Sequence, residues 1–194
     1  MVYVFLANGF EEIEALTPVD LLRRMNVETK LVAVSSSENS SGDLVITGAR
    51  GISVVCDMSL DELINGEGTD NMDIAVLPGG MPGTLNLRGS KPLMELIDKQ
   101  NEKGGRIAAI CAAPAKILGE RGMLKGKKAT CYPGMENLMA GAILSADSVV
   151  TDGNITTSRG MGTAMAFGLE MVKLLLSEAA AKDLAEGVVA KGEV

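Results

Sequence analysis

The chain has 194 residues, of which 46% are apolar and 22% are charged, so we expect one domain with a substantial core. Acidic residues outnumber basic ones by 25 to 18, and the formal charge of −7 argues against nucleic acid or an anionic membrane as partner, because both require a cationic face. There is no histidine, which excludes a Cys–His pair, a Ser–His–Asp triad and a histidine-bound metal.

Strands and helices are predicted to alternate along the chain. Runs of apolar and β-branched residues predict strands at 2–7, 29–35, 44–47, 52–57, 73–80 (ending in a Pro-Gly-Gly turn) and 106–110, and a hairpin at 148–158. Helical spacing of apolar residues predicts helices at 11–25, 59–64, 90–104, 113–122, 162–178 and 179–190. Pro18 lacks the amide hydrogen that a helix interior needs, so the first helix is expected to kink there or to begin near it.

This order of elements predicts an α/β fold with a mostly parallel sheet covered on both faces, in a single domain that spans 1–194. No apolar run approaches the roughly 18 residues of a transmembrane helix, and the N-terminus does not have the pattern of a signal peptide. The cysteines, Cys56, Cys111 and Cys131, show no CxxC spacing, which argues against a disulfide scaffold and for a reducing cytoplasm.

Cys111 is the first candidate for a functional residue, because it lies between a predicted strand and a predicted helix. Ligands of parallel α/β folds bind beyond the carboxyl ends of the strands, where this residue falls. A thiol in the first turn of a helix feels the positive end of the helix dipole, which favours a reactive thiolate. The alternative is a buried core thiol, since free cysteine packs as a small hydrophobe.

Glycines and glutamates fall at the same edge of the predicted sheet. Gly79 and Gly80 form an ordinary turn, or they leave backbone amides free to stabilise an oxyanion together with the amide of Ala112. Glu11 and Glu12 are expected to be surface groups favoured by the helix dipole. Glu14 can face inward, where burial and a nearby thiolate would raise its pKa and keep it protonated for hydrogen bonding or proton exchange.

Two further segments have weaker signals. Cys131 is interpreted as structural, whereas Tyr132 is a candidate for lining the pocket, although a phenol with a pKa of about 10 is a poor base. The basic stretch KGKK at 125–128 is interpreted as a solvated turn.

With its motifs in chain order, the sequence resembles the ThiJ/PfpI superfamily, in the branch of the parkinsonism-associated deglycase and its bacterial relatives. The resemblance covers almost the whole chain and depends on the segments VFLANGFEEIEALTPVDLLRR, DIAVLPGG, NLRGSKPLMELI, IAAICAAPAKIL and ITTSRGMGTAMAFGLEMV.

The resemblance implies a flavodoxin-like three-layer α/β/α sandwich of the class I glutamine amidotransferase-like type, commonly a homodimer. It also implies roles for particular residues: Cys111 as the nucleophile-elbow cysteine, Glu14 as the carboxyl that contacts its sulfur, Gly79, Gly80 and Ala112 as the backbone amides, and Arg24 and Arg50 as arginines associated with anions near the dimer interface. Many members have a histidine where this chain has Tyr132, so we predict that the protein is not a peptidase.

Family activities implied by the resemblance are glutathione-independent glyoxalase, protein deglycase, oxidation of the cysteine to sulfinate in redox sensing, and chaperone-like activity. We therefore predict an enzyme that acts on small reactive carbonyls through Cys111 and Glu14, without a cofactor or metal. The alternatives are a non-enzymatic sensor or chaperone that responds to an oxidant through Cys111, and an inactive scaffold that uses only its dimer surface.

Overall fold

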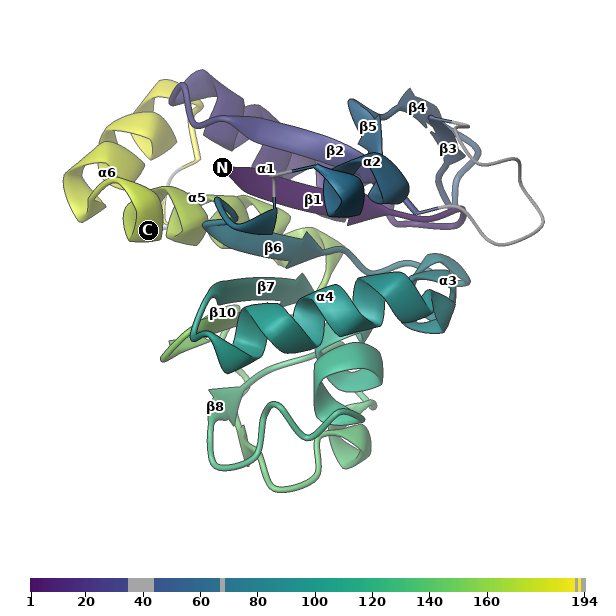
Figure 1. The fold of residues 1–194 in the computed structure, drawn as a ribbon. Helices are drawn as coiled ribbons and strands as arrows, with labels where there is room; N and C mark the ends of the chain where they lie inside the picture. Colours follow the sequence, from purple (N-terminus) through teal and green to yellow (C-terminus); the bar gives the residue numbers. More distant parts are fainter. Residues whose placement is uncertain (35–43, 67–68, 191, 193–194) are drawn as a thin grey trace.

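A seven-stranded sheet forms the centre of the computed structural model, which describes residues 1–34, 44–66, 69–190 and 192. Its strand order is β10-β11-β7-β6-β1-β2-β5 (Figure 1). The strands are β1 (Val2–Leu6), β2 (Thr29–Ala33), β5 (Met58–Ser59), β6 (Ile74–Leu77), β7 (Arg106–Ile110), β10 (Val149–Asp152) and β11 (Ile155–Ser158). All neighbours pair in parallel except β10 and β11, which form an antiparallel hairpin at one edge.

Two small sheets lie outside this centre. An antiparallel pair is formed by β3 (Val45–Thr47) and β4 (Ser53–Val55), and a parallel pair by β8 (Lys128–Ala129) and β9 (Ile143–Leu144). The turn between β3 and β4 reaches the start of the first helix, since the amide of Ala49 donates to the carbonyl of Phe10 at 2.7 Å.

Helices cover both faces of the central sheet (Figure 1). One face packs against α1 (Glu12–Arg24), α5 (Ala164–Leu175) and α6 (Glu178–Gly187). The other packs against α2 (Leu60–Asn65), α3 (Gly83–Gly89), α4 (Lys91–Glu102) and the π-helix η2 (Pro114–Gly119). Short 3₁₀ turns form η3 (Glu136–Leu138) and η4 (Met161–Thr163). Within the described residues, no helix is both long and apolar enough to cross a bilayer.

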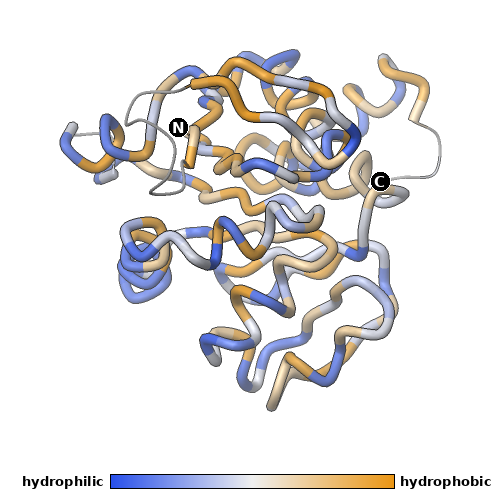
Figure 2. The backbone as a smooth tube through the Cα atoms, turned by 90° about the vertical axis from the view of Figure 1, so that its right-hand side faces the viewer, coloured by the Kyte–Doolittle hydropathy of each residue, from blue (hydrophilic) through white to orange (hydrophobic). Residues whose placement is uncertain are grey.

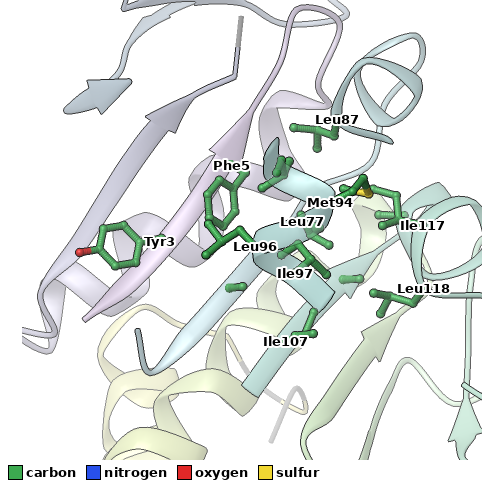
Figure 3. Close-up of a cluster of buried hydrophobic side chains, with 14 of the residues drawn as sticks. Tyr3, Phe5, Leu77, Leu87, Met94, Leu96, Ile97, Ile107, Ile117 and Leu118 are labelled. Carbon is green, nitrogen blue, oxygen red and sulfur yellow. The ribbon is translucent and has the colours of Figure 1, made fainter. Parts of the chain in front are cut away.

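The alternation of side chains along β1 explains why there are two cores. Tyr3 and Phe5 point into the core beneath α4, and Val4 and Leu6 point into the core beneath α1 and α5, because successive strand residues face opposite sides of a sheet. Figure 3 shows Phe5 close to Leu96 of α4 in the first core. The central strands are buried on both faces and are correspondingly apolar along their length (Figure 2).

The predicted three-layer parallel fold is confirmed, and the predicted strands and helices are found close to their expected ends. The serine caps of α2 and α4 are present, with Ser59 forming a full capping box. Pro18 lies inside α1, which begins six residues earlier, so the helix does not begin near the proline. Residue 35 of the second predicted strand lies outside the described residues. The sequence predictions missed α3 and the two-residue strands β5 and β9, which are too short to show a period, whereas β8 lies where a strand was expected, just before Cys131.

Close packing of α1 on α5 predicts a strict size limit at Gly168. A Cβ there would lie 2.6 Å from Leu21 Cδ1 and 3.1 Å from the Cα of Pro18. We expect Gly168→Val to lower the free energy of unfolding by about 1–3 kcal/mol, measured by urea denaturation. Gly187→Val is the matched helical control, since nothing lies within 4 Å of a Cβ at that position. Equal urea midpoints for the two variants would contradict the prediction.

Candidate functional site

Cys111 lies directly after β7, at the carboxyl end of the parallel strands. Its φ of 65° is left-handed, a conformation that costs a residue other than glycine about 1–3 kcal/mol. Two backbone hydrogen bonds hold it there: its N–H donates to the carbonyl of Ser158 at 2.9 Å, and its carbonyl accepts the N–H of Tyr132 at 2.8 Å. A strained residue between a strand and a helix is the arrangement known as a nucleophile elbow, which exposes the side chain above the sheet.

The exposure of the three cysteines separates their roles. Cys56 and Cys131 are only 3% and 2% exposed and fit the interpretation as core thiols. Cys111 is partly exposed, unlike the other two cysteines. The structure therefore favours the accessible-thiol interpretation over the buried-core alternative for this residue.

Glu14 is the partner of Cys111. It lies in the first turns of α1, is 1% exposed, and its Oε2 accepts the N–H of Gly79 at 2.9 Å. The carboxyl also hydrogen-bonds the thiol of Cys111 and the backbone amide of Met161. A Cβ on Gly79 would lie 2.5 Å from Glu14 Oε2 and 2.6 Å from Cys111 Cβ, so only glycine lets these two side chains meet.

The protonation of the pair follows from its burial. Burial raises the pKa of Glu14 to about 7, and the charge of Glu11 adds to this effect, while the hydrogen bonds from Cys111, Gly79 and Met161 oppose it. Burial, followed by the charge and the hydrogen bond of Glu14, raises the pKa of Cys111 to about 12. The helix was expected to lower the pKa of the Cys111 thiol. While Glu14 is ionised, the structure does not show this lowering. The pair retains one proton, shared between carboxyl and sulfur, at neutral pH.

The predicted backbone donors act on two different atoms. The amides of Gly80 and Ala112 hydrogen-bond the sulfur of Cys111, which favours its charged form. The amide of Gly79 is already donated to Glu14, so the expectation that it is free for an oxyanion is wrong. The physical reason is that a buried carboxyl requires hydrogen bonds of its own.

The expectation that Glu11 and Glu12 are surface groups is also wrong, since they are 9% and 3% exposed. The turn between β3 and β4 covers them. Glu12 Oε1 accepts the N–H of Arg50 at 2.7 Å and that of Ile52 at 3.4 Å. Glu11 Oε2 lies 3.6 Å from Arg50 Nη2. A contact between segments this far apart in the chain has no periodic signal in the sequence.

The remaining candidates are divided by the structure. Tyr132 lies at the site, because a Cβ on Gly160 would be 3.5 Å from its ring and 3.8 Å from Glu14 Oε1. Arg50 is largely exposed and reaches the site only through its contact with Glu11. Arg24 lies ten residues after Glu14 on α1, about 15 Å along the helix axis, and pairs with Asp20. The single chain does not bring Arg24 to Cys111.

The amide of Met161 is a contact that no sequence prediction identified. Its segment, SRGMGT, is one of the motifs that carry the family resemblance, but the sequence assigned no role to any residue in it. A turn rich in glycine at the carboxyl end of a strand was the one available signal, and such turns are common.

The raised pKa of Glu14 predicts how stability depends on pH. Folding raises this pKa from 4.5 to about 7, so the folded state binds more protons between these values and Glu14 reduces stability as the pH rises. Relative to Glu14→Gln, the free energy of unfolding of the wild type should fall by about 3 kcal/mol between pH 4.5 and pH 8. Urea denaturation across this range measures the difference. Parallel curves for the two proteins would reject the raised pKa.

Comparisons with known proteins agree with this geometry. Residues 1–174 match the DJ-1/PfpI family. Protein DJ-1 homolog B of Arabidopsis thaliana is 40% identical over 190 residues, which are 97% of this chain and 41% of that protein. The chain thus spans less than half the length of the two Arabidopsis relatives it matches. Deglycase PfpI of Pyrococcus furiosus is 37% identical over 171 residues, 87% of this chain and 95% of that protein.

Solved structures give the same result. Oxidized DJ-1 of Toxoplasma gondii has a TM-score of 0.88 at 31% identity, with 97% of each chain covered. DJ-1beta of Drosophila melanogaster has a TM-score of 0.86 at 33% identity, with 97% of this chain and 96% of that chain covered. The predicted ThiJ/PfpI resemblance and flavodoxin-like fold are confirmed. The chain belongs to the DJ-1/PfpI family.

Proposed function

We propose that this protein is a cysteine-dependent enzyme for small reactive carbonyls, of the glutathione-independent glyoxalase or deglycase type. The observation that carries the proposal is the contact between the partly exposed sulfur of Cys111 and the buried carboxyl of Glu14. This contact places a nucleophile and a proton carrier within reach of the same substrate atom. The similarity to a protein named Deglycase PfpI supports the substrate class.

Methylglyoxal illustrates the chemistry. The sulfur of Cys111 bonds to the aldehyde carbon, the electron pair of the C=O bond moves to the oxygen, and Glu14 gives that oxygen its proton. The Glu14 carboxylate then removes the hydrogen from the same carbon, and the electron pair of that C–H bond forms a C=C bond while the ketone oxygen takes the negative charge. The proton returns to the former ketone carbon, and the hydroxyl proton of the first carbon moves to the oxygen of the second, which gives a lactoyl thioester. One carbon is thereby oxidised and the other reduced within a single molecule. Water hydrolyses the resulting thioester, which releases lactate and restores the thiol.

The shared proton makes the nucleophile available at neutral pH. When the proton lies on Glu14, the carboxyl no longer repels charge on sulfur and instead donates a hydrogen bond to it. The amides of Gly80 and Ala112 stabilise the same thiolate. The reactive form is therefore the singly charged pair with its charge on Cys111, and attack on the aldehyde needs no base other than Glu14.

Lactate formation from methylglyoxal without glutathione, followed by NMR, tests the enzyme. We expect turnover in the wild type, none in Cys111→Ser, and a loss of about 10²- to 10⁴-fold in Glu14→Gln, whose amide cannot exchange a proton in the same way. Cys56→Ala is the control for loss of a thiol, because Cys56 is buried away from the site, and should remain active. Equal rates, or equal inactivity, of wild type and Cys111→Ser would sink the enzyme proposal.

A second candidate function, peroxide sensing, is favoured by the difference in exposure among the cysteines. The thiolate of Cys111 attacks peroxide, which is reduced to water as the sulfur becomes sulfenate, and a second equivalent gives sulfinate. A protonated Glu14 would donate a hydrogen bond to the sulfinate oxygen. The thiols of Cys56 and Cys131 are buried, so peroxide reaches them less easily and they should react more slowly than Cys111.

Mild peroxide treatment followed by intact-mass analysis and peptide mapping tests the sensor. We expect a gain of two oxygen atoms, located on Cys111, while the other two cysteines stay reduced. Oxidation of Cys56 or Cys131 ahead of Cys111 would contradict this function.

A further inference from the structure

A chain of hydroxyl groups fastens the turn that follows β11. The N–H of Gly160 donates to Thr163 Oγ1 at 3.1 Å, and this oxygen lies 2.7 Å from Ser158 Oγ. The hydroxyl of Ser158 donates to the carbonyl of Ser148 at 2.8 Å. In addition, the N–H of Thr163 donates to the carbonyl of Gly160 at 2.8 Å. Ser158 is fully buried, so this network is held away from competing water.

The turn closed by this network touches both members of the Cys111–Glu14 pair. The backbone amide of Met161 hydrogen-bonds the Glu14 carboxyl, and a Cβ on Gly160 would lie 3.8 Å from Glu14 Oε1. The carbonyl of Ser158 accepts the N–H of Cys111 at 2.9 Å. The hydroxyl network therefore supports a segment that contacts the carboxyl in addition to Gly79 and Cys111.

We propose that Ser158 and Thr163 are positioning residues for Glu14, and that their hydroxyls hold the 159–161 turn so that the Met161 amide stays on the carboxyl. The inference rests on the proposed function, because it concerns the same proton carrier. With amides from Gly79 and Met161 both donating to the carboxyl, the hydrogen bond left for its own proton is the one to the sulfur of Cys111. Without Thr163 Oγ1, the amide of Gly160 loses its acceptor, and of the two N–H hydrogen bonds that join these residues only the backbone bond from the Thr163 N–H to the Gly160 carbonyl remains.

Other charged groups near Glu14 act independently of this turn. Glu11 and Cys111 act on the carboxyl directly, from the start of α1 and from the end of β7. Arg50, on the turn between β3 and β4, reaches it only through Glu11. From the 159–161 turn itself, Arg159 donates to the carbonyl of Ala146, so this turn acts through its backbone.

The ring of Tyr132 lies beside the same turn, since a Cβ on Gly160 would be 3.5 Å from it. Substitution of Thr163 therefore tests the amide contact without altering a charge.

The experiment is a pH titration of the Glu14 carboxyl by infrared difference spectroscopy, with the band assigned by its loss in Glu14→Gln. We expect Thr163→Val, which removes the hydroxyl and keeps the side-chain shape, to raise the midpoint by about half a pH unit or more, because the ionised carboxyl loses a donor. Thr163→Ser keeps the hydroxyl and should titrate within the error of the wild type. Ser158→Ala provides a second variant, expected to shift in the same direction, should Thr163→Val fail to fold.

Thr29→Val is the matched control. Thr29 is a buried threonine whose hydroxyl donates one hydrogen bond, to the carbonyl of Val27 at 2.9 Å, at the opposite end of the sheet. The substitution Thr29→Val should lower the free energy of unfolding and leave the midpoint of the Glu14 titration unchanged. The inference would be overturned if folded Thr163→Val or Ser158→Ala titrated with the wild-type midpoint. It would also be overturned if Thr163→Ser shifted the midpoint as far as Thr163→Val does. The titration needs no turnover, so its failure is distinct from failure of the lactate assay, which rejects the proposed function.

Discussion

The buried contact between Glu14 and Cys111 is the interaction on which the rest of the site depends. Ionising a carboxyl that is 1% exposed costs desolvation free energy, and so does ionising the sulfur beside it. The pair therefore keeps one proton at neutral pH, and every proposed step moves that proton or uses the charge it leaves behind. The proposed catalysis of carbonyl chemistry and the proposed formation of a sulfinate would both use this arrangement.

Close approach of three backbone segments makes this contact possible. The left-handed turn at Cys111 brings its side chain above the sheet, and the absence of a Cβ at Gly79 leaves room for the carboxyl beside it. The 159–161 turn completes the enclosure from the edge of the sheet. Since all three segments follow parallel strands or face their carboxyl ends, the parallel topology itself brings them together.

Charge around the site is balanced by contacts between distant segments. Glu11 raises the pKa of Glu14, and Glu11 in turn lies 3.6 Å from Arg50 Nη2. Glu12 binds two amides of the turn that presents Arg50, so the hairpin of β3 and β4 contributes to the electrostatics of a site it does not enter.

The sequence by itself determined the parallel α/β fold and the position of Cys111 after a strand, and it left Glu14 able to face inward, because strand runs, helical spacing and chain order are local properties. It also excluded histidine chemistry outright. Only the tertiary structure decided that Glu11 and Glu12 are buried, that the Gly79 amide is donated to Glu14, and that Met161 supplies a second amide. These contacts depend on which distant segments of the chain meet. Burial raises the pKa values of Glu14 and Cys111, and it arises only when these segments pack together.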